Sequence, residues 1–365
     1  MIAIILAGGG GTRLWPVSRR GNPKQVEAII GRDSLLQATY ARLRRGFGVR
    51  DIYVATASAQ RRRIAAQLPG LPSGNLIVEP CRRDTAAAIG HALLQVSRRH
   101  PKETFVIINS DAYIRDVEEY LRVIRLAGSM AEAKPDHTML IGLRPTYPET
   151  GYGYIKTGRL IKRLPSGRGR KADFVFVVDR FVEKPDLETA KEYLASGGYL
   201  WNPTLVVGRV DHFLALFAGH LPKHAAIFAR MAKAFGRPNE RRAVQALFRR
   251  LPSVSIDYGI LEKAEKMLVL PADFGWADVG NWRTVKDILS RSPEENIIKG
   301  LHVGIDSSGN LIYSFSGKLV ATAGVCNMII IETGDAVLVC PRERAQDVKK
   351  IVAALEKERR LKKYL

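Results

Sequence analysis

Residues 1–25 read MIAIILAGGGGTRLWPVSRRGNPKQ, an apolar segment that runs into four glycines. The apolar run at residues 2–6 has the length of one strand, and an uninterrupted run of this kind is typical of a strand covered on both faces. Glycines lack a Cβ, so their backbone N–H groups can converge closely on an anion. The glycines at residues 8–11 therefore predict a phosphate-binding loop after the first strand.

Further apolar runs of strand length occur at residues 52–56, 76–79, 105–109 and 138–143, and helical patterns separate them. One helical pattern starts after Asp33, which we expect to cap that helix. This alternation predicts an α/β fold with a Rossmann-like, doubly wound and mostly parallel sheet. Ligands bind such a sheet at the carboxyl ends of its strands, where the glycine loop lies.

In the second half of the chain, the regular alternation of predicted strands and helices ends. Residues 199–208 suit one strand, and residues 255–266 suit a helix with an acidic start. After residue 293, short strands are joined by Gly, Ser and Asp turns, and a charged helix closes the chain. We therefore expect a catalytic domain at residues 1–292 and a small β-rich domain at residues 293–365, of a type that stacks turns or pairs with its own copy.

Composition narrows the class of protein. The 365 residues carry a formal net charge of +21, which attracts polyanions such as nucleic acids or phosphorylated small molecules. The basic residues are scattered and no stacking-aromatic motif accompanies them, so we expect a generally basic surface and no nucleic-acid partner. No run of 18 apolar residues occurs, and the first apolar run is too short for a signal peptide. We expect a cytoplasmic protein without a membrane partner.

Cysteine usage agrees with a reducing compartment. Cys81, Cys326 and Cys340 are the three cysteines, and they form no CxxC pair. A zinc site is therefore not expected.

Two common phosphate loops do not fit the first stretch. The P-loop ends in Gly-Lys-Ser/Thr, whereas this loop ends in Gly-Thr-Arg. The dinucleotide fingerprint needs a third glycine where Arg13 stands. Taken alone, the glycines also suit a purely structural turn. The wider pattern of residues around the loop is therefore needed to distinguish a phosphate-binding loop from such a turn.

That wider pattern resembles the sugar-1-phosphate nucleotidyltransferases, whose signature is L-A-G-G-x-G-T-R-L-x-P followed by P-K. The Trp-Pro-x-Ser-Arg and Pro-Lys-Gln continuations resemble the mannose-1-phosphate guanylyltransferase branch. EPCRRDTAAAI, RPTYPETGYGYI, FVEKPDLETAKEYLASGGYLWN, SIDYGILEKA and GWADVGNW resemble further segments of that branch, in order and spacing. The resemblance covers residues 1–290, and the tail resembles the small left-handed β-helix-like domain of these enzymes.

The resemblance implies a reaction of GTP with mannose 1-phosphate that gives GDP-mannose and pyrophosphate. Two polyanions must meet, so charge neutralisation and positioning would supply most of the acceleration. Arg13 and Lys24 are the implied catalytic cations. Asp111, after the apolar run at 105–109, and Asp278 are the implied carboxylate ligands of Mg²⁺, which prefers oxygen ligands.

The resemblance also implies the residues that hold the two substrates. Guanine presents N1–H and N2–H₂ donors and needs an acceptor, which Glu79 can supply. The expected nucleotide-binding set is Leu6, Ala7, Gly8, Gly9, Gly11, Thr12, Glu79, Arg82, Thr85 and Asp111. The expected sugar-phosphate set is Gly153, Glu183, Lys184 and Asn202. Adjacent strand residues point to opposite faces, so Glu183 and Lys184 need a bend to share a ligand, and Pro185 is expected to help supply it.

Two segments depart from the family pattern and keep alternatives open. NSDAY has Asn109 and Ala112 where the family has proline and histidine, and Asn202 is followed by Pro203 and Thr204 in place of a small residue and glycine. We expect Pro203 and Thr204 to stiffen the strand beside the sugar. Another sugar 1-phosphate, another nucleotide, or a nucleotide-sugar-sensing regulatory role are therefore alternatives. We also expect a homodimer and no phosphomannose isomerase activity.

Overall fold

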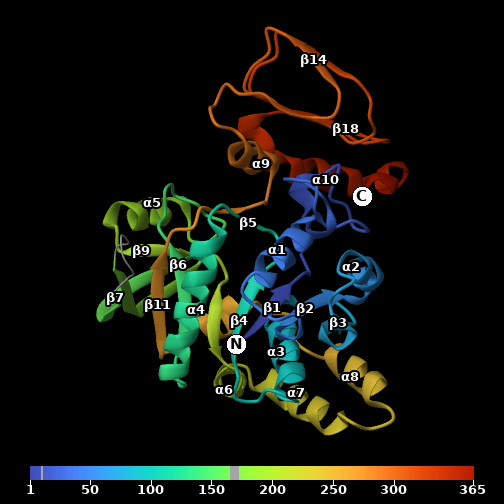
Figure 1. Cartoon of the computed structure of the whole chain (residues 1–365). Helices are drawn as coiled ribbons and strands as arrows, with labels where there is room; N and C mark the ends of the chain where they lie inside the picture. Colours follow the sequence, from blue (N-terminus) through green and yellow to red (C-terminus); the bar gives the residue numbers. More distant parts are fainter. Residues whose placement is uncertain (10, 165–171) are drawn as a thin grey trace.

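The computed structural model describes residues 1–9, 11–164 and 172–365, so Gly10 of the expected glycine loop lies outside the described residues. The described part of the chain is built around a ten-stranded sheet (Figure 1) with the order β11-β8-β7-β9-β6-β10-β4-β1-β2-β3. These strands are β1 Ile2–Leu6, β2 Ile52–Ala57, β3 Leu76–Glu79, β4 Thr104–Asn109, β6 Thr138–Leu143, β7 Gly153–Leu164, β8 Asp173–Glu183, β9 Tyr199–Asn202, β10 Val206–Arg209 and β11 Met267–Ala272.

The expected first strand lies inside the parallel part of this sheet. β1 pairs in parallel with β2 on one side and with β4 on the other, and β3 continues the parallel order beyond β2. Ala3, Ile4 and Ile5 have no solvent exposure, as expected for a strand covered on both faces. The glycine loop therefore leaves the sheet at the carboxyl edge of its parallel half.

The other half of the sheet is mixed. β10 runs antiparallel to β4 and β6, β7 runs antiparallel to β8 and β9, and β11 is parallel to β6. The single strand expected over residues 199–208 is two strands, β9 and β10, because Pro203 and Thr204 lie in the connection between them. Proline has no N–H to donate to a ladder, which explains the break.

Helices cover both faces of the sheet, and this confirms the doubly wound α/β class. One hydrophobic cluster joins β1 and β4 to α3 and α6–α8, and a second joins the opposite face to α1, α2 and α4. The α-helices are α1 Leu35–Arg44, α2 Arg61–Gln67, α3 Asp84–Ser97, α4 Val117–Ala133, α5 Leu187–Ser196, α6 Val210–His220, α7 Pro222–Ala234, α8 Glu240–Phe248, α9 Trp282–Leu289 and α10 Val348–Lys357.

Two helix expectations are wrong in detail. Ser34, not Asp33, caps α1: its hydroxyl accepts from the backbone N–H of Gln37, and the Gln37 side chain accepts from the backbone N–H of Ser34. The segment at residues 255–266 forms only a π-helical turn at Asp257–Leu261. That turn carries buried groups beside β8, so tertiary packing outweighs its helical pattern.

The carboxyl-terminal strands form a separate unit, drawn in orange and red in Figure 1. They are β13 Ile297–Lys299, β14 His302–Ile305, β15 Leu311–Ser314, β16 Val320–Ala323, β17 Met328–Glu332 and β18 Val337–Pro341. β13, β15 and β17 pair in parallel, as do β14 and β16, while β18 is antiparallel to β17. Successive parallel strands on two separate sheets give the β-helix-like stack that the resemblance implies.

A third hydrophobic cluster joins this unit to the segment after the glycine loop. Leu14, Trp15 and Val17 pack with Trp282 of α9 and with side chains of β15, β17 and α10. The indole N–H of Trp15 donates to the Tyr364 carbonyl at 2.9 Å. The carboxyl-terminal unit therefore supports the segment that carries Arg13.

Two further observations concern the expected compartment. Among the described residues, no helix combines the length and the apolar character needed to cross a membrane. Cys81, Cys326 and Cys340 carry free thiols. A cytoplasmic location stays a prediction.

Candidate active site

The glycine loop has its shape because Gly11 adopts a left-handed backbone. Its φ is 64°, and a Cβ there would lie 2.6 Å from Ser18 Oγ and 2.8 Å from Lys24 Cγ. A residue with a side chain would therefore meet both steric strain and a clash. The two 3₁₀ turns that follow, Thr12–Leu14 and Lys24–Val26, bring Arg13 and Lys24 into the same region.

A short antiparallel pair of strands brings the two expected metal ligands together. β5 (Ala112–Ile114) follows Asp111, β12 (Trp276–Asp278) ends at Asp278, and Asp278 pairs with Ala112. The backbone N–H of Val279 donates to the Asp111 carbonyl at 3.2 Å. Two residues that are far apart in sequence are therefore held beside each other by this strand pair.

The ammonium of Lys24 lies between these carboxylates. Its Nζ is 2.9 Å from Asp111 Oδ2, 3.5 Å from Asp278 Oδ1 and 3.1 Å from the Val279 carbonyl oxygen. Burial disfavours the charged amine, but Asp111 and Asp278 outweigh that effect and raise the pKa of Lys24. Burial raises the pKa of Asp278, against the opposing effect of Lys24. Lys24 is thus a buried cation that neutralises an acidic pair.

Arg13 makes a contact that the sequence does not indicate. Its Nη1 donates to Gln346 Oε1 at 3.0 Å, and Gln346 belongs to a 3₁₀ turn of the carboxyl-terminal unit, Arg342–Asp347. Arg13 also lies close to Gly280, where an added Cβ would be 3.5 Å from Nη2 and 2.5 Å from Asp278 Oδ2. The implied catalytic arginine is therefore held by Gln346, and little space separates it from the backbone at Gly280.

A cavity of about 420 Å³ opens beside the glycine loop. Among the expected nucleotide residues, those that line it are Leu6, Ala7, Gly8, Gly9, Glu79, Arg82, Thr85 and Asp111. Gly11 and Thr12 do not line it and lie farther along the loop. Glu79 at the end of β3 is 7% exposed, and burial raises its pKa to about 7 against the opposing charge of Arg82. The cavity thus combines backbone donors at one wall with a buried carboxyl at another.

The expected sugar-phosphate residues lie side by side on three neighbouring strands. Gly153 of β7 pairs with Glu183 of β8 on one side and with Asn202 of β9 on the other. A Cβ at Gly153 would lie 2.6 Å from Glu183 Oε2. Lys184 Nζ contacts Glu183 Oε1 at 2.7 Å. All four expected residues therefore meet at one place in the sheet.

The bend that lets Glu183 and Lys184 share this site is at Lys184 itself. Lys184 has φ 51°, and its backbone N–H donates to the Tyr152 carbonyl at 3.1 Å. A left-handed residue other than glycine costs free energy, and such residues cluster at functional sites. The positive φ angle belongs to Lys184, the residue before Pro185. Any contribution of Pro185 to the bend is therefore indirect.

Asp257 is a site residue that the sequence reasoning missed. Asn202 Nδ2 donates to Asp257 Oδ1 at 3.2 Å. Burial and, to a lesser degree, the neighbouring Glu183 carboxylate raise the pKa of Asp257 to about 7. The backbone N–H of the preceding Ile256 donates to Thr85 Oγ1 at 2.8 Å, which joins this turn to the nucleotide cavity. The available signal was the position of Asp257 inside SIDYGILEKA, one of the segments that carry the resemblance.

A second cavity, of about 580 Å³, borders the acidic pair. It reaches Asp278 and Gln346, and its aromatic wall is formed by Tyr147, Tyr152, Trp201 and Trp276. These rings pack edge to face, with centroids 4.9–5.4 Å apart. The sequence reasoning did not assign this wall, although Tyr152 and Trp201 flank the expected residues Gly153 and Asn202.

The structure shows where the two departures from the family pattern lie. Asn109 ends β4 and lines the nucleotide cavity, and Ala112 begins β5. Thr204 has φ 60°, a left-handed angle that favours the glycine of the family pattern. Pro203 and Thr204 lie between β9 and β10, so the expectation that they stiffen a strand is wrong; they shape a connection instead.

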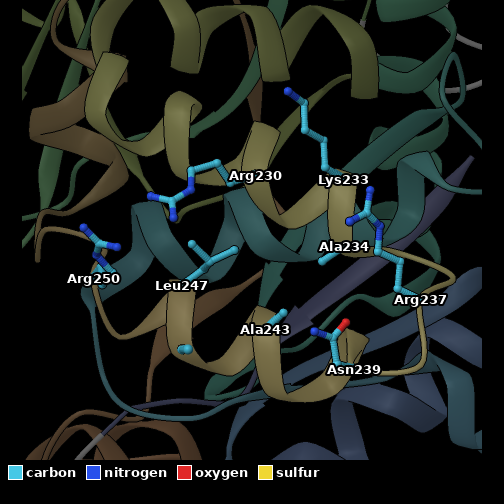
Figure 2. A pocket seen from close by; sticks show the side chains of 9 residues that line it. Arg230, Lys233, Ala234, Arg237, Asn239, Ala243, Leu247 and Arg250 are labelled. Carbon is cyan, nitrogen blue, oxygen red and sulfur yellow. The ribbon is translucent and has the colours of Figure 1, made fainter.

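A basic groove lies apart from these residues. Figure 2 shows Arg230 and Arg250 at one end of the groove between α7 and α8, and Lys233 with Arg237 at the other. Its volume is about 460 Å³, and no acidic residue is among the described residues that line it. None of the expected site residues lines it either. Part of the net charge of +21 is therefore concentrated here rather than spread evenly.

The acidic pair suits a hard divalent cation. Asp111 and Asp278 supply carboxylate oxygens, and both already contact a positive charge, that of Lys24. Among the described residues, no group of three or more His, Cys, Asp or Glu side chains is placed to hold a metal ion. The protein thus offers two carboxylates, which is the usual protein contribution to a Mg²⁺ ion that also binds substrate phosphates.

Comparison with protein families gives two matches. Residues 2–294 match the family described as nucleotidyl transferase. Residues 300–355 match the family described as the MannoseP isomerase/GMP-like beta-helix domain.

Curated relatives match nearly the whole chain. The xanthan biosynthesis protein XanB of Xanthomonas campestris pv. campestris is 36% identical over 360 residues, which are 98% of this chain and 73% of that protein. A mannose-1-phosphate guanylyltransferase of Klebsiella pneumoniae is 35% identical over 363 residues, which are 99% of this chain and 75% of that protein. These relatives are longer than the chain.

Solved structures give a matching result. A Thermus thermophilus protein described as a mannose-1-phosphate geranyltransferase superimposes with a TM-score of 0.85 at 33% identity, covering 97% of this chain and 99% of that one. A Helicobacter pylori protein described as a mannose-6-phosphate isomerase has a TM-score of 0.59 at 20% identity over 76% of this chain and 99% of that one, a likeness of fold alone.

Proposed function

Because the chain belongs to the nucleotidyl transferase family, in its mannose-1-phosphate guanylyltransferase branch, we propose that it transfers GMP from GTP to mannose 1-phosphate. A phosphate oxygen of mannose 1-phosphate attacks the α-phosphorus of GTP. The bond from that phosphorus to the oxygen it shares with the β-phosphorus breaks, and this oxygen leaves with pyrophosphate. The products are GDP-mannose and pyrophosphate. The observation that carries the proposal is the arrangement of one cavity with a buried carboxyl, Glu79, beside a glycine loop that ends near a lysine and an arginine.

Each substrate is assigned to one end of the site. Guanine is placed against Glu79, whose carboxylate accepts from N1–H and N2–H₂, and the phosphates lie along Gly8, Gly9 and Gly11. Mannose 1-phosphate is placed against β7–β9, with its phosphate on Lys184 and its hydroxyls on Glu183 and Asn202. The hydrogen bond from Ile256 to Thr85 supports this placement, because it fixes one end relative to the other.

We assign to Arg13 and Lys24 the stabilisation of the negative charge that develops during transfer. Arg13 stabilises the α-phosphate and the departing pyrophosphate, and the hydrogen bond to Gln346 orients its guanidinium. Lys24 contacts phosphate oxygens after leaving the acidic pair. Arg13 is a donor fixed before the reaction, and removing one such preorganised donor typically lowers the rate about 10²–10³-fold.

We also propose that the reaction depends on Mg²⁺. Asp111 and Asp278 would hold the ion, and phosphate oxygens and water would complete its shell. When bound, Mg²⁺ neutralises phosphate charge and orients the triphosphate. Titration of turnover with Mg²⁺ in Asp278→Asn and in the unmodified chain tests this role. Equal Mg²⁺ requirements in both would contradict the assignment.

A homodimer is proposed through the carboxyl-terminal unit. Val303 and Ile305 of β14 and Val337 and Val339 of the edge strand β18 are 52–68% exposed, so apolar side chains are uncovered on both sheets of this unit. A second copy of the chain would cover those on β18. Light scattering during size-exclusion chromatography should give twice the 40.5 kDa chain mass, and Val337→Glu should shift it toward one chain. A single-chain mass for the unmodified protein would contradict the proposal.

Pyrophosphate release tests the function directly. We expect release and GDP-mannose formation with GTP and mannose 1-phosphate in the presence of Mg²⁺, and much less with other nucleotides or sugar phosphates. Binding of GDP-mannose without release would support the nucleotide-sugar-sensing alternative instead. Efficient turnover with a different sugar phosphate would overturn the substrate assignment and leave the family intact.

A further inference from the structure

We propose that Lys24 occupies the place of the divalent cation in the free protein and thereby couples metal binding to nucleotide binding. Its ammonium neutralises Asp111 and Asp278 until nucleotide phosphates draw it away, and only then do both carboxylates become available to the metal. The proposal rests on the proposed function in one respect, the identity of the ligand that draws Lys24 away.

The hydrogen-bonding capacity of Lys24 is fully used inside the protein. An ammonium has three N–H donors. Nζ has one acceptor on each of three residues: Asp111 at 2.9 Å, Asp278 at 3.5 Å and the Val279 carbonyl at 3.1 Å. The Lys24 side chain is only 9% exposed. A phosphate can therefore gain a hydrogen bond from Nζ only if Nζ gives up at least one of these contacts.

The two carboxylates that contact Lys24 are the ones proposed to hold the metal. Asp111 Oδ2 and Asp278 Oδ1 both contact the ammonium, and a divalent ion beside it would meet a like charge at close range. Lys24 and the metal therefore compete for the acidic pair. Free metal should bind the nucleotide-free protein weakly, even though two carboxylates are in position.

The geometry also limits how Lys24 can move. Its Cβ and Cγ pack against Gly11, where an added Cβ would lie 2.9 and 2.8 Å from them. The stem is thus held against the glycine loop, and the ammonium end is the part free to turn toward a phosphate bound there. Nucleotide binding on the loop then releases the carboxylates, and by reciprocity the metal strengthens nucleotide binding by the same factor.

Manganese binding without turnover tests the coupling. Free Mn²⁺ is measured by electron paramagnetic resonance in titrations of the nucleotide-free protein, with Lys24→Met beside the unmodified chain. We expect Lys24→Met to bind Mn²⁺ at least about tenfold more tightly, within the usual range of coupling factors. A non-hydrolysable GTP analogue should tighten Mn²⁺ binding in the unmodified chain, after correction for Mn²⁺ held by the free analogue, and should tighten it much less in Lys24→Met.

Two controls separate this effect from general charge. Lys299→Met also removes a partly buried lysine, one whose Nζ donates to the Ala28 carbonyl at 2.7 Å, and it should leave Mn²⁺ affinity unchanged. Adding Asp278→Asn to Lys24→Met should abolish the gain. Equal Mn²⁺ affinity in Lys24→Met and the unmodified chain, or a gain that survives Asp278→Asn, would overturn the proposal.

The proposal can still be tested if the Lys24→Met variant does not fold. If Lys24→Met does not fold, the unmodified chain still decides, because absence of a nucleotide effect on its Mn²⁺ affinity would contradict the coupling. No sugar phosphate is present in these titrations. A chain that couples Mn²⁺ to a nucleotide without making GDP-mannose would therefore overturn the proposed function alone.

Discussion

At the residue scale, we assign the recognition of guanine to Glu79. It is a buried carboxyl at the end of β3, on the wall of the cavity that the glycine loop opens. A carboxylate accepts two hydrogen bonds from the Watson–Crick edge of guanine but finds only one donor on that edge of adenine. Nucleotide preference should therefore depend on this side chain more than on the loop.

We predict that Glu79→Gln lowers kcat/KM for GTP about 10- to 100-fold, because the amide N–H₂ then faces guanine N1–H donor to donor. The same amide complements adenine, so kcat/KM for ATP should fall less or rise. Steady-state kinetics with both nucleotides measures this. Equal losses for GTP and ATP would show that Glu79 does not read the base.

The pKa of Glu79 predicts a pH dependence. Burial raises it to about 7 in the free protein, and only the ionised form accepts the two guanine donors. As pH falls through 7 the carboxylate is lost, so kcat/KM for GTP should fall about tenfold per pH unit below 7 and level off above it. Profiles from about pH 5.5 to 8.5 check this.

The control for this pH limb is Asp257, whose pKa burial also raises to about 7. Glu79→Gln should remove the part of the limb that Glu79 contributes, whereas Asp257→Asn should retain it. A profile that stays flat in the unmodified chain would contradict the assignment.

We predict that Thr204→Gly stabilises the protein. Thr204 is a β-branched residue at φ 60°, and relief of its strain, about 1–2 kcal/mol, should exceed the added flexibility of the unfolded chain, about 0.5–1 kcal/mol. Its backbone N–H keeps the hydrogen bond to Asn202 Oδ1. Urea unfolding should show a gain of about 0.5–1 kcal/mol in the free energy of unfolding. A loss of stability would mean that the Thr204 side chain makes a favourable contribution.

At the element scale, the loop after β1 and the β5–β12 pair work as one assembly. The loop presents Arg13 and Lys24, and the strand pair presents Asp111 and Asp278 to the same ammonium. Each element depends on the other, since Lys24 would lose its ion-pair partners and the two carboxylates would repel each other.

We predict that Gly11→Ala lowers kcat/KM at least about 100-fold, the scale of losing one preorganised donor. The added Cβ would strain a backbone at φ 64° and displace Lys24 and Ser18. Gly31→Ala is the matched control, because nothing lies within 4 Å of a Cβ added there. Activity of Gly11→Ala near that of Gly31→Ala would show that the loop does not need this conformation.

At the scale of the whole molecule, the carboxyl-terminal unit completes the core around the active-site segment. Trp15 and Trp282 pack with residues of β15, β17 and α10 in one cluster. Arg19 pairs with Asp335 at 2.6 Å, across the same boundary. The predicted catalytic domain at residues 1–292 therefore shares its third hydrophobic cluster with the rest of the chain.

We predict that residues 1–292 alone do not form a stable enzyme. Removal of the carboxyl-terminal unit exposes Leu14, Trp15 and Val17, each worth about 1.5–3 kcal/mol, against a total stability of about 5–15 kcal/mol for a typical domain. Limited trypsin digestion should cut first near Arg19 and Arg20. A cooperative thermal transition together with turnover near that of the full chain would contradict this.

The sequence by itself determined the glycine loop, the buried first strand, the doubly wound class and the family. Each of these depends on residues that are close in sequence, so periodicity or a short motif is enough to reveal them. The expected sugar-phosphate set came from the family resemblance and stays a prediction, and the structure places Gly153, Glu183 and Asn202 on adjacent strands.

Only the tertiary structure decided how those residues meet. Arg13 contacts Gln346, 333 residues away, and Lys24 contacts Asp278, 254 residues away. Asp257 lies in a single π-helical turn where a longer helix was expected, and it accepts a hydrogen bond from Asn202. Such contacts depend on which strands pair and where the chain crosses between layers, and no local pattern in the sequence records that choice.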